Sequence, residues 1–144
     1  MRKGFTLLEL LVTISIIGIL LAIGAVSFTT AQKRGRDSRR QGDMKSMQKA
    51  LEECYAIDTE YPQTAASGAA LGCTSGTVTM NQVPGDPKPA SVYVYSVDGD
   101  PATTYCLCAS LENLGNGNAD STGAGGSCSF ATTNNDYFCV SNQQ

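Results

Sequence analysis

The chain has 144 residues, which is enough for one domain in addition to a membrane-spanning helix. It contains no histidine, no Gly-x-Ser-x-Gly nucleophile motif and no phosphate-binding glycine loop, so the sequence indicates neither an enzyme nor a cofactor site. The net charge of -3 is unevenly distributed, because beyond residue 50 the chain carries ten acids and a single base, Lys88.

The first predicted element is one long helix over residues 5–57, whose apolar half covers residues 5–28. No residue from Leu10 to Gln32 is charged, a stretch of 23 residues, whereas about 20 apolar residues suffice to cross the core of a bilayer. Glu9 lies just before this stretch, where a carboxylate is costly unless a partner compensates its charge. The apolar half is therefore expected to be a transmembrane helix with one unexplained carboxylate.

Four interpretations of this segment compete. A simple membrane anchor explains its length but not Glu9. A cleaved secretory signal explains the basic start and offers Ala22 to Gly24 as a cleavage site, but a carboxylate disfavours such a core. A lipoprotein anchor would need a cysteine at the end of the core, and the first cysteine is Cys54. The fourth interpretation is processing between Gly4 and Phe5.

Residues 29–57 are predicted to continue the helix as an amphipathic segment. Apolar side chains recur at intervals of three and four residues, which indicates one apolar stripe that packs on a sheet. The stripe comprises Met44, Met47, Leu51, Cys54 and Tyr55. Basic residues on the other faces are interpreted as a solvent- or subunit-facing surface. Nucleic acid is not indicated directly, because acids are interleaved with these bases and no aromatic residues accompany them. The bases are Lys33, Arg34, Arg36, Arg39, Arg40, Lys45 and Lys49.

Residues 58–144 are predicted to form a small β-rich head domain. β-Branched and aromatic residues indicate strands over 92–97, 103–111 and 136–141, with a weaker candidate over 78–83. The segment 115–127 is rich in glycine, asparagine and serine and is predicted to be a mobile loop. The fold class is therefore α+β: a long N-terminal helix, transmembrane in one half and amphipathic in the other, packed on a small antiparallel sheet.

All six cysteines follow the apolar segment, and their spacing fits neither a Cys/His nor a four-thiolate zinc site. Disulfides are the favoured interpretation, and they require an oxidising space outside the cytoplasm. Cys54 at the end of the helix and Cys73 in the following loop form a natural pair.

The pairing of the other four cysteines is not fixed by the sequence. Strand alternation places Cys106 and Cys108 on the same face of their strand. The nested pairing Cys106–Cys139 and Cys108–Cys128 is preferred, and the swapped pairing stays open.

The start of the chain closely resembles a known processing signal. The residues Arg2-Lys-Gly-Phe-Thr-Leu-Leu-Glu-Leu-Leu-Val-Thr resemble the class III signal of type IV pilins and of the pseudopilins of type II secretion. The resemblance implies that a prepilin peptidase removes residues 1–4 by cleaving after Gly4 and that Phe5 is then N-methylated. It also implies that Glu9 attracts the N-terminus of a neighbouring subunit inside a filament.

The resemblance is looser beyond the first 30 or so residues, and two departures matter. Many family members have a proline midway along the membrane helix, where this chain has Ala25 and Val26. Major pseudopilins also carry an acidic, calcium-binding loop, whereas the candidate ligands in this chain match it poorly, so no metal is expected. These candidates are Asp98, Asp100, Asn116, Asn118 and Asp120.

The resemblance implies a structural subunit of a type IV pilus or pilus-like filament, polymerised through its N-terminal helix, with no enzymatic activity and no cofactor. The alternative within the family is a pseudopilin of a type II secretion or DNA-uptake system. The alternative outside it is a membrane-tethered or secreted monomeric binding domain. The implied partners are further copies of the chain in a helical homopolymer, other pilin-like subunits, the prepilin peptidase/methylase, an inner-membrane assembly platform and, before assembly, membrane lipid.

The expected location is the cytoplasmic membrane, crossed once with the C-terminal domain outside, followed by an extracellular pilus or a periplasmic or wall-spanning pseudopilus. Arg2 and Lys3 favour this orientation, whereas the bases after the helix point the other way by the positive-inside count. The cysteines and the processing signal favour the orientation in which the C-terminal domain lies outside the cytoplasm. We further expect the basic stretch, including Arg39 and Arg40, to complement the acidic head domains of neighbouring subunits.

Overall fold

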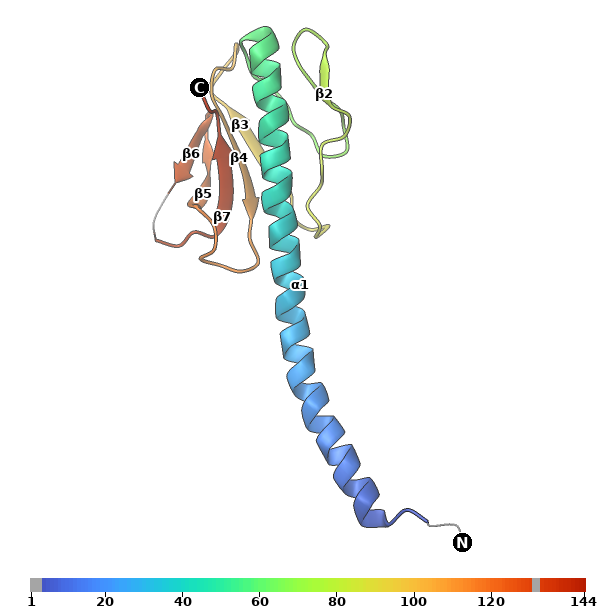
Figure 1. The fold of residues 1–144 in the computed structure, drawn as a ribbon. Helices are drawn as coiled ribbons and strands as arrows, with labels where there is room; N and C mark the ends of the chain where they lie inside the picture. Colours follow the sequence, from blue (N-terminus) through green and yellow to red (C-terminus); the bar gives the residue numbers. More distant parts are fainter. Residues whose placement is uncertain (1–3, 131–132) are drawn as a thin grey trace. The chain divides into compact units, whose positions relative to one another are not determined.

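The computed structural model describes residues 4–130 and 133–144 of the chain. It divides into two compact units, residues 1–34 and residues 35–144. Helix α1 (Leu7–Asp58) is the only α-helix among the described residues, and it contributes residues to both units (Figure 1). The chain is therefore α+β, as predicted.

The described part of the first unit is helical from Leu7 onward, and its described side chains are all exposed. Leucine and isoleucine dominate this part of α1, and neither Gly18 nor Gly24 has an atom within 4 Å of where a Cβ would lie. The unit thus has no apolar core of its own among the described residues. Its exposed apolar side chains can therefore pack against another apolar surface, such as lipid or protein.

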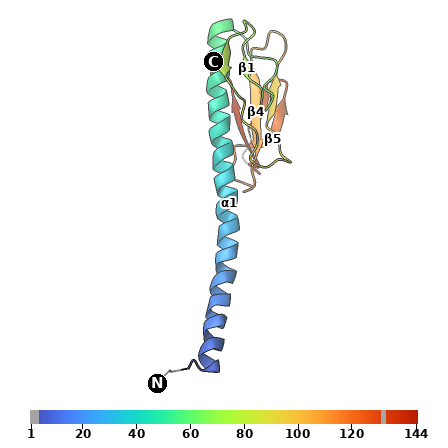
Figure 2. The ribbon, with the colours of Figure 1, turned by 90° about the vertical axis from the view of Figure 1, so that its right-hand side faces the viewer.

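The second unit contains a five-stranded antiparallel sheet with the order β3-β4-β7-β5-β6. Figures 1 and 2 show this sheet alongside the second part of α1. Its strands are β3 (Val94–Val97), β4 (Tyr105–Ser110), β5 (Ala119–Ala124), β6 (Ser127–Phe130) and β7 (Tyr137–Ser141). A separate two-stranded sheet pairs β1 (Leu71–Gly72) with β2 (Val78–Met80).

Helix α1 ends where the backbone leaves helical geometry. Thr59 has a φ of 60°, and its amide donates a hydrogen bond to the carbonyl oxygen of Tyr55 at 2.8 Å. A left-handed residue in this position is a common helix stop. The following residues turn back toward the sheet, since the amide of Tyr61 donates to the carbonyl of Ala102 at 2.8 Å.

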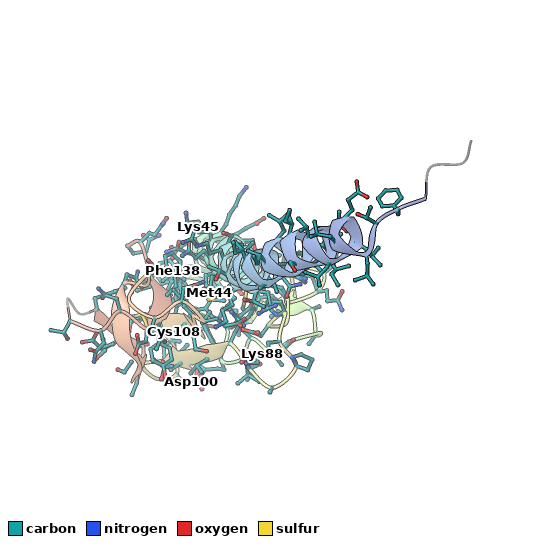
Figure 3. The ribbon with its side chains drawn as sticks, turned by 90° about the horizontal axis from the view of Figure 1, so that it is seen from below. Met44, Lys45, Lys88, Asp100, Cys108 and Phe138 are labelled. Carbon is teal, nitrogen blue, oxygen red and sulfur yellow. A yellow bond between two sulfur atoms is a disulfide. The ribbon has the colours of Figure 1, made fainter. Side chains whose placement is uncertain are left out.

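The core of the second unit lies between α1 and one face of the sheet. Met44, Met47 and Leu51 of α1 are fully buried in it, which confirms the predicted stripe. Alternation along β4 directs Tyr105 and Leu107 into this core. Figure 3 shows Met44 on the sheet side of the helix and Lys45 pointing away from the sheet.

The opposite face of the sheet carries a small core of its own. Cys106, Cys108 and Cys139 are buried there with Ala119. The same-face prediction for Cys106 and Cys108 is therefore confirmed. The carbonyl oxygen of Thr122 in β5 lies 3.4 Å from the sulfur atoms of both residues, so the β5–β6 hairpin covers this face.

The prediction of a mobile loop over residues 115–127 is wrong, because β5 and the start of β6 form there. The Gly125-Gly126 pair makes the two-residue turn between them, with φ values of 54° and 75°. Such a glycine pair is a recognised hairpin signal. The strand sequence Ala-Asp-Ser-Thr-Gly-Ala has little β propensity, so other contacts must hold the hairpin in place.

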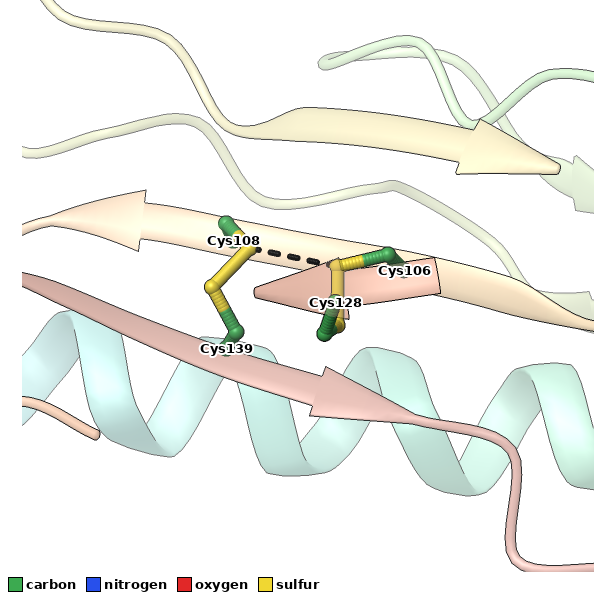
Figure 4. Close-up of side chains that lie close together, drawn as sticks. All are labelled: Cys106, Cys108, Cys128 and Cys139. Atoms are coloured by element: carbon green, nitrogen blue, oxygen red, sulfur yellow. Dashed lines mark hydrogen bonds between the residues drawn. A yellow bond between two sulfur atoms is a disulfide. The ribbon is translucent and has the colours of Figure 1, made fainter. Parts of the chain in front are cut away.

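One disulfide joins Cys54 to Cys73, the pair expected from the sequence. The other two join Cys106 to Cys128 and Cys108 to Cys139 (Figure 4). The preferred nested pairing is therefore wrong and the swapped pairing is present. The register of the sheet explains this, because Cys108 in β4 lies directly opposite Cys139 in β7.

Candidate assembly site

The N-terminal end of α1 is closed by its own side chains. Glu9 Oε2 accepts hydrogen bonds from the Thr6 amide at 3.0 Å and from Thr6 Oγ1 at 2.8 Å. In return the Glu9 amide donates to Thr6 Oγ1 at 3.3 Å. This reciprocal pattern is a capping box, and it satisfies amides that the first helical turn would otherwise leave unpaired.

The capping box was not anticipated, although its signal is present in the sequence as Thr6-x-x-Glu9 before an apolar run. It gives the Glu9 carboxylate a partner within a single copy of the chain. Both bonds from Thr6 reach Oε2, so in the described part of the chain Oε1 accepts no hydrogen bond. Glu9 therefore keeps one oxygen for a partner from outside.

The predicted processing site lies immediately before the helix. Gly4 and Phe5 have no regular secondary structure and are exposed, Phe5 to 84%. Arg2 and Lys3, the basic residues of the predicted leader, lie outside the described residues. The peptide bond between Gly4 and Phe5 is thus in an irregular, exposed segment of the kind that a peptidase can bind.

The surface that follows is strongly apolar. By length and composition, one helix in the described ranges is able to cross a membrane, namely α1, in which an 18-residue window has a mean hydropathy of 2.6. Large apolar side chains between Leu7 and Phe28 are exposed to between 45% and 82%. An apolar surface of this extent requires lipid or another protein to cover it.

The head domain contains a charge network that sequence reasoning missed. We define it by its members: Arg36, Asp37, Arg40, Asp86 and Glu112. Arg40 is 1% exposed, and its guanidinium donates to both oxygens of Asp86, at 2.7 and 2.8 Å. Its Nη1 also donates to Asp37 at 2.8 Å and to Glu112 at 3.0 Å.

The other members join α1 to the loop that follows β4. Arg36 donates to both carboxylate oxygens of Glu112, at 2.6 and 2.7 Å. Asp37 accepts hydrogen bonds from the amides of Glu112 and Asn113, each at 2.9 Å. The network thus fixes the first turns of this part of α1 to two loops, because Asp86 lies in the segment after β2.

The network shifts the ionisation of its members. The hydrogen bonds that Arg40 donates to Asp86, Asp37 and Glu112 raise its pKa against the opposing effect of burial. The hydrogen bond from Arg36, supported by Arg40, lowers the pKa of Glu112 to about 2. Burial tends to raise the pKa of Asp37, but hydrogen bonds from Glu112, Asn113 and Arg40 outweigh it and lower this pKa. All three groups are therefore held in their charged forms.

These contacts correct the expectation for the basic stretch. Arg40 is buried in the charge network and cannot reach a neighbouring subunit. Arg36 is engaged with Glu112. Arg39, by contrast, has a side chain that is 63% exposed and only a 3.9 Å contact with Asp43.

The acidic and amide residues considered for calcium are not brought together. Asp98 accepts from the Thr103 and Thr104 amides in the β3–β4 turn. Asp120 accepts from the amides of Asn134 and Asn135. The remaining candidates have other surroundings: Asn118 pairs with the backbone of Cys139, Asn116 donates to the carbonyl of Asn113, and Asp100 is exposed. Each carboxylate stabilises its own loop.

Comparison with known proteins agrees with this geometry. Residues 1–25 match the family model for the prokaryotic N-terminal methylation motif. The chain is 33% identical over 108 residues to the type IV wide pilus major component PilA4 of Thermus thermophilus, covering 74% of this chain and 72% of that protein. It is 39% identical over 116 residues to a type IV major fimbrial protein FimA of Dichelobacter nodosus, covering 81% and 69%.

A further relative is the type II secretion system core protein G of Pectobacterium carotovorum, 29% identical over 109 residues, with 74% of this chain and 66% of that protein covered. No solved structure shows a significant match to the chain.

A methylation-type N-terminus, an exposed apolar helix and an α+β head define the class of pilin-like filament subunits. The chain belongs to the type IV pilin family. It is a structural subunit of a type IV pilus or pilus-like filament.

Proposed function

We propose that the chain forms the shaft of a type IV pilus after cleavage between Gly4 and Phe5 and methylation of Phe5. The observation that carries this proposal is the uncovered apolar helix of residues 7–34, which bears a single carboxylate, Glu9, four residues after Phe5. Packing many copies of this helix side by side would remove its apolar surface from water and lipid.

Glu9 would direct this packing. Cleavage leaves a positively charged amine on Phe5, and Oε1 of Glu9, which Thr6 does not engage, would bind in one copy the amine of the next. Inside an apolar bundle, such a pair costs much less than two separate charges. Thr6 would hold the carboxylate ready for the incoming copy, because its hydrogen bonds fix Oε2.

Before assembly the subunit would lie in the cytoplasmic membrane, with residues 7–34 in contact with lipid and the disulfide-bonded residues 35–144 outside the cytoplasm. Two observations support this location: the hydropathy of α1 and the three disulfides of the head. Reducing conditions in the cytoplasm would not preserve such bonds. The prepilin peptidase and the assembly platform would act on the subunit in this state.

Two variants separate the roles of Glu9. Glu9→Gln keeps the capping box, because glutamine also caps at this position, but removes the charge. Thr6→Ala removes the cap and keeps the charge. We expect Glu9→Gln to lower the yield of sheared filaments about tenfold or more, as loss of a charge pair in an apolar site does, and Thr6→Ala to lower it much less. Equal filament yields for Glu9→Gln and the unmodified chain would rule the proposal out.

A pseudopilin is the second candidate function, favoured by the similarity to the type II secretion system core protein G. Electron microscopy of sheared surface material distinguishes the two. Long filaments that contain this chain support the pilus, and their absence in cells that secrete normally through a type II system supports the pseudopilin.

A further inference from the structure

The second unit carries an exposed basic surface on α1, on the side away from the sheet. We call it the basic helix face and define it as Arg39, Lys45 and Lys49. All three side chains are exposed, and Lys45 points away from the sheet (Figure 3). Among the described residues, no carboxylate lies within 4.0 Å of the ammonium group of Lys45 or Lys49. The fold of a single copy therefore does not use these two charges.

A second, acidic surface lies where α1 ends. We call it the acidic end and define it as Glu60, Asp98 and Asp100. Glu60 follows the end of α1 and precedes Tyr61, whose amide donates a hydrogen bond to the carbonyl of Ala102 next to the β3–β4 turn. Gln63 donates to the carbonyl of Gly99 in the same turn, at 2.8 Å. The segment that follows the helix therefore lies beside this turn, so Glu60 is on the same side of the head as Asp98 and Asp100.

In the described ranges, no basic group lies within 4.0 Å of the carboxylates of the acidic end. The amide of Thr104, followed by the hydroxyl and amide of Thr103, lowers the pKa of Asp98 to about 2, so this carboxylate is ionised at neutral pH. The single base after residue 50, Lys88, lies elsewhere, because its amide binds Asp86 of the charge network. Figure 3 shows Asp100 on the opposite side of the head from Lys45.

A filament needs two different, complementary surfaces on each subunit. A surface that binds only itself closes a dimer, whereas two unlike surfaces that bind head to tail propagate an open helical polymer. The basic helix face and the acidic end meet this requirement, since like surfaces repel and unlike surfaces attract. Electrostatic complementarity of this kind selects orientation and speeds association.

We propose that the acidic end of one copy binds the basic helix face of another copy when the filament forms. The proposal rests on the filament function proposed above and names the contact between head domains. It replaces the earlier expectation for Arg40, which is buried, with Lys45 and Lys49, which are exposed. A second copy is the occupant, because the head itself supplies the complementary charges.

Charge exchange between the two surfaces tests the contact. Lys45→Glu/Lys49→Glu reverses the basic helix face, and Glu60→Lys/Asp100→Lys reverses the acidic end without touching Asp98, which stabilises its turn. Each double variant is expected to lower the yield of sheared filaments about tenfold, and the quadruple variant to recover at least half of the original yield. Near-UV circular dichroism of the full chain in detergent confirms that each variant is folded.

Asp136→Lys is the matched control. Asp136 lies outside the acidic end, next to β7, where its carbonyl accepts a hydrogen bond from the Leu111 amide. Reversal of its charge should leave the filament yield unchanged. Neutral variants, Lys45→Gln/Lys49→Gln, should assemble with a weaker dependence on salt, because screened charge pairs contribute less.

Several outcomes would overturn the contact. The contact would be refuted if the folded charge-reversal variants formed filaments in normal yield. It would also be refuted if the quadruple variant recovered none of the lost filament yield. Normal filament yield together with lost retention on heparin or on vesicles of anionic lipid would assign the basic helix face to those polyanions instead. Failure of the unmodified chain to form filaments would instead refute the filament function, so the two failures are distinguishable.

Discussion

At the scale of single residues, Arg40 shows how a buried charge can be part of a helix stripe. Its guanidinium is 1% exposed and donates to three carboxylates. Asp37 and Arg40 extend the three-and-four spacing of the apolar stripe toward the N-terminus, so the sequence contained a signal that both face the sheet. Their partners were not predictable, because Asp86 and Glu112 are 46 and 72 residues from Arg40.

We predict that Arg40→Met destabilises the head. The change leaves the side chain of Asp86, which is 1% exposed, buried without its counter-charge. Breaking one half of such a pair costs about 3–5 kcal/mol of unfolding free energy. Urea unfolding of the full chain in detergent, followed by tyrosine circular dichroism, measures the loss.

The matched control for this prediction is Arg39→Met, at an exposed neighbouring position. Its effect should stay within about 0.5 kcal/mol, which is typical of surface substitutions. A small loss for both variants would mean that the charge network does not stabilise the head.

We predict that acid weakens the head through Glu112. Its pKa falls from an ordinary 4.5 to about 2 on folding, so its contribution is fully present above pH 4.5 and is lost as the pH falls toward 2. Glu112→Gln should therefore be less stable than the unmodified chain at pH 7, with the difference shrinking as the pH is lowered. Urea unfolding at several pH values between 7 and 2 measures this convergence. A difference that does not change with pH would contradict the assignment.

At the scale of elements, the parts with strong local signals were predictable. Strands β3, β4 and β7 contain aromatic and β-branched residues and lie close to their predicted positions. Strand β5 has no such signal, and long-range contacts determine it: the disulfide from Cys106 to Cys128 in β6 and the bonds of Asn118 to the backbone of Cys139. The disulfide pairing was ambiguous for the same reason, because it depends on the register between strands far apart in the sequence.

We predict that the β5–β6 turn tolerates a side chain at one glycine and not at the other. A Cβ at Gly126 would lie 2.7 Å from the carbonyl oxygen of Thr104 and 2.8 Å from the amide nitrogen of Asp98, which is too close for either atom. A Cβ at Gly125 would have no atom within 4 Å. Both glycines have positive φ, so each alanine variant carries a backbone cost of about 1–2 kcal/mol.

Thermal unfolding of both variants separates strain from steric clash. Gly126→Ala should lower the unfolding free energy by about 1–3 kcal/mol more than Gly125→Ala, because overpacking adds a cost of that size. Equal losses would show that the turn does not pack on the β3–β4 turn in the way described.

At the scale of the whole molecule, the two units have different roles, and each role belongs to its own continuous segment of the sequence. Residues 1–34 contain the methylation motif, and the described side chains of this unit form no buried core. Residues 35–144 contain the hydrophobic core and all three disulfides. A filament subunit needs both: an N-terminal helix that is covered only by other copies, and a head that is stable outside the cell.

The mass of the mature protein tests the central claim most directly, because processing between Gly4 and Phe5 precedes every later step of the proposed assembly. Intact-mass spectrometry of the chain isolated from its host membrane or from sheared filaments should show loss of residues 1–4 and one added methyl group. Fragmentation should place that methyl group on the amine of Phe5. A mature chain that retains residues 1–4, or one cleaved after Gly24, would contradict the account.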